Sequence, residues 1–447
     1  MASFNKGNIT SRDTTIGVSA KGNVQHNKTS EQVLFETLVS HMYGKDSYHE
    51  GGAAILSRFD TALADVLRRG QFQFVNNLVN FARNEMGMRS MPIYAGVKTA
   101  HLCRTLGLKN PLLKETVGST ISRADALTEV FALSVQTFGN KKAIPQAIKK
   151  ALADSFEKFD EYQFAKYKAE GKAVWLRDVM RVVLLKPADD ARAALYGRIK
   201  TNTMPNPETW EVLFTQNGQL PVTERKSDKD IWIGLLKSRK LGMLALLRNM
   251  RRMIASGMDN DFAKLIADTL TNQHAVRKSK VFPYQIYMSY KAMEMNRTSL
   301  SASHYNILMA ALESALELSV ENVPDLGDNV WILLDTSGSM HGPMGGRQSF
   351  GHSGYVSQGP TIKMVEMAAL FAAIVFKRSA TFNYNVAMTR FDTDASMLNI
   401  NPRDTVLTIT RNIMATRQGG ATYIWAALDL MPRLGFKPQT VILFSDM

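Results

Sequence analysis

Asp335, Ser337 and Ser339 follow the spacing Asp-x-Ser-x-Ser, which places three oxygen-bearing side chains on one short turn. The turn comes directly after the apolar residues 330–334, a run typical of a buried strand. In open α/β sheets, ligands collect where the parallel strands end. Carboxylate and hydroxyl oxygens are the donors that hard cations such as Mg²⁺ take up. The turn is therefore a candidate cation site.

Two further oxygen donors occur later in the chain. Thr422 follows a Gly-Gly-Ala turn, and Asp446 comes shortly after the apolar run 441–444. A donor set of hydroxyls and carboxylates without His or Cys favours Mg²⁺ or Mn²⁺ over zinc. The alternative is that Asp335 and the two serines only cap a helix, as such residues often do. The presence of Thr422 and Asp446 favours the metal site.

These residues together resemble the metal-ion-dependent adhesion site of von Willebrand factor A domains. The resemblance implies that a cation is held, directly or through water, by Asp335, Ser337, Ser339, Thr422 and Asp446. It also implies a binding role, since in that family an acidic group of a partner completes the coordination of the metal. Catalysis is not implied.

The segments that must position this site alternate between strands and helices. Strands are predicted at 330–335, 384–390, 397–400 and 440–444, and helices at 362–378, 406–415 and 424–431. Such alternation predicts a doubly wound α/β domain over residues 328–447. Residues 341–360 are rich in Gly, Ser and Gln and are predicted to form an exposed loop.

Residues 30–323 have a different pattern. Apolar residues recur there at spacings of three and four, and short Pro-containing breaks separate the stripes, which predicts many medium-length helices stacked as hairpins. Ser30 is the expected N-cap of the first helix. Residues 1–29 are polar, with few large apolar side chains, and are expected to form a flexible arm.

The excess positive charge belongs to the helical part. The chain of 447 residues has 54 Lys and Arg, 40 Asp and Glu, and a net charge of +14. Residues 301–447 contain 10 basic and 12 acidic side chains, which leaves 44 and 28 for residues 1–300. That imbalance favours a polyanion such as nucleic acid as partner. One cysteine, no secretory signal and no apolar run of membrane-spanning length predict a soluble, cytoplasmic protein.

Three segments of the helical part resemble signatures of the TROVE module: residues 172–187, 240–253 and 281–286. A TROVE module followed by a von Willebrand A domain is the architecture of the Ro 60 kDa autoantigen family and its bacterial Ro-like members. The resemblance implies a ring of HEAT-like helical repeats closed by the A domain. It further implies binding of small noncoding Y-type RNAs on the outer basic face, entry of single-stranded RNA ends into the central hole, and work beside exoribonucleases in RNA quality control, without cleavage of RNA.

The residues expected to contact RNA are basic side chains of the first two signatures and their surroundings. They are Lys166, Lys168, Lys172, Arg177, Arg181, Lys186, Arg248, Arg251 and Arg252. The last three occur at i, i+3 and i+4 and are expected on one helical face. Tyr162 and Tyr167 are candidates for stacking on unpaired bases, whereas Trp175 is expected in the core.

Two departures from the family pattern affect these expectations. Leu184 stands where the family often has a histidine that contributes to Y RNA binding, which argues against a standard Y RNA but not against RNA in general. The chain ends one residue after Asp446, whereas family members continue, so we expect an incomplete A domain that belongs to a fragment or is completed by another polypeptide.

Two classes of function remain open. The first is an RNA-binding protein, expected to be monomeric. The second is a protein-interaction adaptor whose metal site binds an acidic partner, with an incidental basic surface. An enzyme is not expected: the glycines near 342–346 lack the Lys-Ser/Thr of a P-loop, and His101 and Cys103 are two residues apart and would not face each other on a helix.

Overall fold

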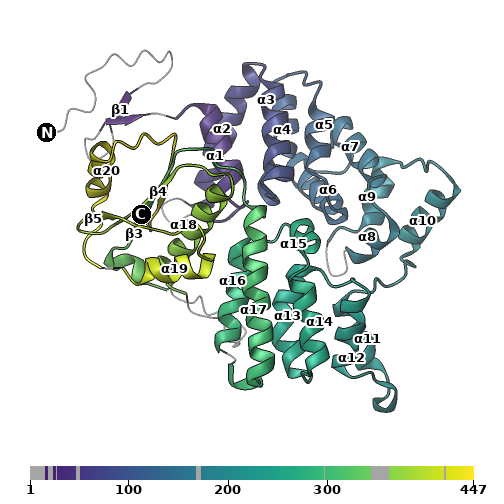
Figure 1. The fold of residues 1–447 in the computed structure, drawn as a ribbon. Helices are drawn as coiled ribbons and strands as arrows, with labels where there is room; N and C mark the ends of the chain where they lie inside the picture. The colour runs from purple at the N-terminus through teal and green to yellow at the C-terminus, as the bar shows by residue number, and fades with distance from the viewer. Residues whose placement is uncertain are drawn as a thin grey trace. The chain divides into compact units, whose positions relative to one another are not determined.

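The computed structural model describes residues 16–18, 24–26, 28–46, 51–167, 173–295, 297–343, 362–416 and 419–446. The chain divides into two compact units, Met1–Pro207 and Glu208–Met447. Figure 1 labels the helices and strands along the chain. Within the described ranges, no helix combines the length and the apolar character needed to cross a bilayer.

The first unit is built almost entirely from helices. Its elements are β1 (Ile16–Val18), β2 (Val24–His26), α1 (Ser30–Ser40), α2 (Gly52–Arg68), α3 (Phe72–Asn80), the π-helical η1 (Phe81–Glu85), α4 (Ser90–Thr105), α5 (Leu113–Ser119), α6 (Ala124–Phe138), α7 (Gln146–Phe156), α8 (Glu161–Lys166), α9 (Leu176–Val183) and α10 (Asp190–Thr201). Helix α3 packs on α5, α4 on α6, α5 on α7 and α7 on α9. Contacts that recur between helices two places apart are those of stacked hairpins, as the sequence predicted.

Local side chains define where these helices begin. The Thr29 hydroxyl accepts a hydrogen bond from the Gln32 N–H, and the Gln32 amide oxygen accepts one from the Thr29 N–H, which is a capping box. The cap of α1 is therefore Thr29, and the prediction of Ser30 was wrong by one residue. Ser30 instead donates its hydroxyl to Asp65 of α2, at 2.7 Å. Within the predicted arm, β1 and β2 pair as a short antiparallel ribbon.

The first unit has apolar clusters of its own. Phe131 and Phe156 are fully buried in one of them, and Cys103, which is 4% exposed, lies in the other. Burial raises the pKa of the Cys103 thiol. Cys103 is therefore a small residue of the apolar core.

The second unit consists of a series of helices followed by a sheet. Its helices are α11 (Trp210–Gln219), α12 (Asp228–Lys237), α13 (Met243–Ala255), α14 (Asn260–Leu270), α15 (Gln273–Ser279), α16 (Pro283–Met295), α17 (Ala302–Ser319), α18 (Met364–Thr381), α19 (Val406–Met414) and α20 (Ile424–Arg433), with 3₁₀ turns η2 (Val222–Glu224), η3 (Arg297–Ser299), η4 (Val320–Asn322) and η5 (Gly338–His341). Its strands are β3 (Val330–Asp335), β4 (Val386–Phe391), β5 (Ala395–Met397) and β6 (Thr440–Phe444).

The sheet has the order β5-β4-β3-β6, with β3 parallel to both β4 and β6 and with β5 antiparallel to β4. Helices cover both faces: one face of β3 packs with α18 and α19, and the other packs with α20. This arrangement agrees with the predicted doubly wound domain. The register pairs Asp335 with Phe391 and Leu334 with Phe444, so the carboxyl ends of the three parallel strands meet at one edge. Most of the predicted 341–360 loop lies outside the described residues.

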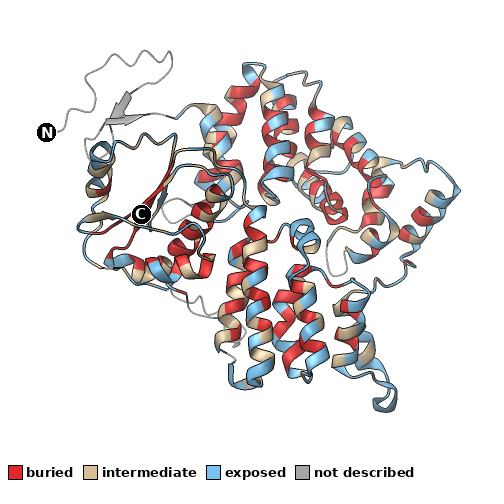
Figure 2. Cartoon of the chain, in the orientation of Figure 1, coloured by how far each residue is buried: buried red, intermediate tan, exposed pale blue. Residues whose placement is uncertain are grey.

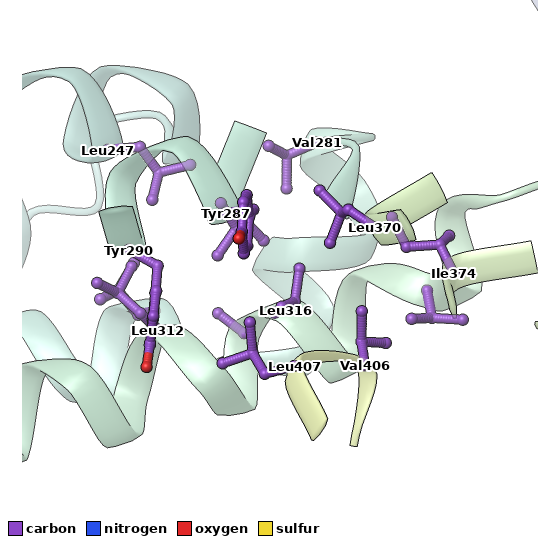
Figure 3. Packing of buried hydrophobic residues seen from close by; sticks show 14 of the residues in the cluster. Leu247, Val281, Tyr287, Tyr290, Leu312, Leu316, Leu370, Ile374, Val406 and Leu407 are labelled. Carbon is purple, nitrogen blue, oxygen red and sulfur yellow. The ribbon is translucent and has the colours of Figure 1, made fainter. Parts of the chain in front are cut away.

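Packing is continuous between the last stacked helices and the sheet. In Figure 3, Leu312 and Leu316 of α17 lie in one apolar cluster with Leu370 of α18 and Val406 of α19. In Figure 2 the buried positions follow the facing sides of these helices and the central strands. Truncating a buried leucine of such a core typically costs about 2–5 kcal/mol. The change from helices to strands near 324–328 therefore marks no break in the core.

Candidate metal centre and nucleic-acid interface

Strand β3 carries Asp335 into the interior of the second unit. All six residues of the strand are buried, and Asp335 is 0% exposed. Its Oδ1 accepts the Ser337 N–H at 2.8 Å, and its Oδ2 accepts the Ser445 hydroxyl at 2.7 Å. These two bonds fix the carboxylate between the turn that follows β3 and the end of β6.

The other predicted ligands lie beside it in one hydrogen-bonded row. The Thr422 hydroxyl donates to Ser337 Oγ at 2.9 Å, and Ser337 Oγ lies 3.2 Å from Ser339 Oγ. Ser339 Oγ donates in turn to Asp446 Oδ1 at 3.3 Å. The fold therefore brings together all five residues that were predicted from the sequence as metal ligands. They come from three segments that are up to 111 positions apart.

Backbone contacts hold the Thr422 loop against the turn. Gly419 N–H donates to the Thr336 carbonyl at 2.8 Å, and Gly338 N–H donates to the Gly420 carbonyl at 3.1 Å. Gly420 has φ of +96°, and a Cβ there would lie 2.3 Å from Thr393 Oγ1. Only glycine fits this position without strain.

The site carries buried negative charge. Asp335 forms no ion pair with any described side chain, although it is fully buried. At the end of the adjacent strand, Asp392 is also 0% exposed; its Oδ1 accepts Asp394 N–H at 3.1 Å and lies 3.2 Å from Arg390 Nη1. Its Oδ2 is buried without a hydrogen-bond partner. Burying such groups is unfavourable unless a cation compensates them.

The donor set fits a hard cation. Hydroxyls and carboxylates are oxygen ligands, and Asp392 adds an unsatisfied oxygen at the same edge of the sheet. Across the described ranges, no group of three or more His, Cys, Asp and Glu side chains is placed to hold a metal, so a cation here depends on the hydroxyls. Asp392 was not selected from the sequence, although an acidic residue just after the second predicted strand was a usable signal.

In the first unit, basic residues near α8 gather around aromatic rings. Lys166 Nζ lies 5.8 Å from the ring centroids of both Tyr162 and Tyr167, and the Arg123 guanidinium lies 4.6 Å from that of Tyr167. Tyr162 is 45% exposed. Lys168 and Lys172 lie outside the described residues. Arg123, far away in sequence, was not predicted here.

Arg123 also belongs to a partly buried charge cluster. It pairs with Asp125 at 2.9 Å, and Arg89 pairs with both Asp125 and Glu129. Burial, followed by repulsion from Arg123 and Arg89, lowers the pKa of the nearby Arg83 guanidinium. Three guanidiniums face two carboxylates, so the cluster retains positive charge.

The first TROVE signature presents its basic residues unequally. Arg177 is half-buried with its guanidinium 4.5 Å from the Trp175 ring centroid. Trp175, expected in the core, is half-buried and is the N-cap residue of α9. Arg181 is exposed and lies 3.8 Å from Asp178, and Lys186 is also exposed.

In the second unit, the three arginines of α13 divide into two groups. Arg248 and Arg251 are exposed and line a groove between α13 and α16. Arg252 does not line it; its guanidinium lies 5.0 Å from the Phe214 ring centroid and 5.4 Å from that of Trp210. Arg252 therefore lies against the aromatic faces of α11 rather than in the groove. The expectation that all three arginines contact RNA stays a prediction.

Comparison with known proteins agrees with this arrangement of a helical stack and a small α/β domain. Residues 179–307 match the TROVE domain model. The crystal structure of the Deinococcus radiodurans RO (RSR) protein is similar, with a TM-score of 0.63, 15% sequence identity, and coverage of 94% of this chain and 86% of that chain. No curated protein matches by sequence.

These matches confirm the resemblance to bacterial Ro-like TROVE proteins and the predicted fold class. The assignment of the α/β part to von Willebrand A domains stays a prediction, as do the domain limits 1–29, 30–323 and 328–447.

Proposed function

We propose that this protein binds RNA through its TROVE helices. The observation that carries the proposal is the groove between α13 and α16, which lies within the matched TROVE segment and contains Arg248 and Arg251. Of the described residues that line it, none is acidic. Phosphate contacts by such arginines supply affinity that falls steeply with salt.

The test compares two charge reversals of equal size in the full chain. Arg248→Glu with Arg251→Glu is expected to weaken RNA binding. Arg403→Glu with Arg433→Glu changes two exposed arginines of the α/β part and is expected to leave binding intact. RNA recovered after crosslinking in cells identifies the ligand. Equal effects of the two double variants would reject the groove as the RNA site.

The RNA we propose is a small noncoding Y-like RNA, or the single-stranded end of a structured or misfolded RNA, bound during RNA quality control. Leu184 argues against the usual mode of Y RNA recognition, since it is 78% exposed at φ of 53° and offers no hydrogen-bonding group. Competition between Y-like hairpins and RNAs with unpaired ends distinguishes these ligands. An exoribonuclease is the proposed protein partner.

We further propose that a Mg²⁺ or Mn²⁺ ion binds at the α/β part. Asp335, Ser337, Ser339, Thr422 and Asp446 would hold it, directly or through water. When bound, the cation supplies a Lewis-acidic position for an oxygen ligand from a partner. The chain's own contribution is to orient the hydroxyls and to keep Asp335 in place through Ser445 and the Ser337 N–H.

A second function, a metal-dependent protein adaptor, is favoured by one observation. Tyr423 and Trp425, just after the proposed ligand Thr422, are each 53% exposed. Aromatic side chains of this kind are common in protein interfaces. We expect Asp335→Ala to lose a protein partner while RNA binding persists. Loss of RNA binding in that variant would instead show that RNA binding depends on the metal site.

A further inference from the structure

The groove between α13 and α16 combines cations with exposed aromatic rings. Its volume is about 410 Å³, which is in the range of sites for small organic ligands. Arg248 and Arg251 line one side from α13, and Tyr284 lines the other from the first turn of α16. Tyr284 is 37% exposed.

A second ring extends this aromatic surface. Phe282 is 46% exposed, and its ring stacks on Tyr284 with centroids 6.4 Å apart and planes 19° from parallel. Exposed apolar side chains that gather in one patch often mark interaction sites, whereas single exposed ones do not. The position is set by the start of α16: Phe282 N–H donates to the Gln285 amide oxygen at 3.0 Å.

None of the described residues that line the groove is acidic. No acidic residue occurs in α13, and Lys280 lies two positions before Phe282. By contrast, the cavity between α11 and α12 is lined by Glu208, Glu224 and Asp230 beside its lysines. The α13–α16 groove is therefore suited to an anionic ligand that also has flat apolar surfaces.

We propose that this groove binds unpaired nucleotides, with bases stacked on Phe282 and Tyr284 and phosphates contacting Arg248 and Arg251. Single-stranded nucleic acid presents both groups together, whereas the bases of a duplex are stacked on one another and withheld from protein rings. The inference rests on the proposed RNA-binding function and adds the place in the fold and the side chains that recognise unpaired bases.

The test measures binding of the full chain to two labelled probes, a short oligouridine and a blunt RNA duplex, by fluorescence anisotropy. Phe282→Leu with Tyr284→Leu keeps apolar side chains but removes the rings. We expect the double variant to bind oligouridine roughly tenfold more weakly, within the roughly 5- to 150-fold expected per lost stacking contact, and duplex unchanged.

Two further variants test whether an effect comes from lost stacking on the ligand rather than from altered packing of the protein. Tyr284 also contacts Phe371 of α18, with ring centroids 6.0 Å apart, so Phe282→Leu alone is measured as well. The matched control is Phe382→Leu. Phe382 is 40% exposed and stacks on Tyr384 at 5.1 Å, but the Tyr384 hydroxyl is hydrogen-bonded to Asp325, so this ring pair lies next to an acidic group. The control is expected to bind both probes as the unchanged protein does.

The outcomes separate the two proposals. Unchanged oligouridine binding by Phe282→Leu and by the double variant overturns the stacking site and leaves the RNA-binding function standing. If the unchanged protein binds the duplex but not oligouridine, the stacking site is likewise overturned and the RNA-binding function stands. Binding of neither probe overturns both. Equally tight binding of a glutamate-rich peptide, lost in the same variants, would assign the groove to a protein and reject the inference.

Discussion

Asp335→Asn provides the sharpest test of the proposed cation site. The substitution removes a charge but retains the shape of a side chain that is fully buried. In the native chain the carboxylate accepts two hydrogen bonds and forms no ion pair with a described residue. Without metal, the variant loses charge-assisted hydrogen bonds that each contribute about 1.5–3 kcal/mol to the free energy of unfolding. This loss is opposed by a gain, because the variant no longer buries an unpaired charge. In EDTA we therefore expect a change in unfolding free energy within about 1 kcal/mol.

Magnesium should separate the two proteins. A ligand at 100 times its Kd stabilises the folded state by about 2.7 kcal/mol. For a cooperative unit of about 150–250 residues, each kcal/mol moves Tm by about 2–4 °C. The unit that contains the site spans Glu208–Met447, so the unchanged protein should gain about 5–11 °C in saturating Mg²⁺. Asp335→Asn should gain almost nothing.

The assay is thermal unfolding followed by circular dichroism, in EDTA and across a Mg²⁺ titration. Asp429→Asn serves as the control, because Asp429 is an acidic residue of α20 outside the proposed ligand set. A Tm for Asp335→Asn that is lowered equally in EDTA and in Mg²⁺ would refute the reasoning, since the carboxylate would then act only as an anchor for the turn. Absence of any Mg²⁺ effect on the unchanged protein would refute the cation site itself.

Three further predictions follow from the same contacts. Arg248→Glu with Arg251→Glu should reduce the magnitude of the slope of log affinity for single-stranded RNA against log salt by about 1.4, as measured by salt titration. EDTA should not change the RNA affinity of the unchanged protein. If EDTA abolished RNA binding, the RNA site and the cation site would be one site. Tyr287→Phe removes a buried hydroxyl that donates to Glu366 at 2.6 Å, and should destabilise by about 1.5–3 kcal/mol in urea unfolding; an unchanged midpoint would mean that water replaces the bond. Gly420→Ala, at φ of +96°, should reduce the Mg²⁺-dependent gain in Tm, and a full gain would show that the loop shifts without cost.

The Tyr287–Glu366 bond also shows how the helical stack meets the α/β part within the second unit. Burial, strengthened by the neighbouring Glu366 carboxylate, raises the pKa of the Tyr287 phenol well above its ordinary value. The hydroxyl therefore remains a donor throughout the range in which proteins are handled. Tyr290 of the same helix accepts a hydrogen bond from Arg411 of α19 at 3.1 Å.

Much of the fold of both units could be predicted from the sequence. The strand at 330–335 was placed to the residue because its first five buried positions form a continuous apolar run that ends at Asp335. The helix starting at Ser30 was found, but its cap was misplaced by one residue, since Thr29 and Ser30 have equally suitable hydroxyls and only the backbone geometry selects between them. The candidate metal ligands could be selected from the sequence because Ser, Thr and Asp side chains supply oxygen donors and follow the ends of the predicted strands.

What the sequence by itself determined is the set of residue types: the oxygen donors after the strands, the basic helices and the TROVE signatures. The tertiary structure decided which of these residues lie next to one another. Arg252 turned to aromatic faces while Arg251 remained in the groove, and Asp392 joined Asp335 because parallel strands end at one edge. Phe282 and Tyr284 had no assigned role in the sequence, whereas in the fold Tyr284 lines the same groove as Arg248 and Phe282 stacks on Tyr284. Local patterns fix periodicity and chemistry, but contacts between distant segments depend on packing that no local pattern encodes.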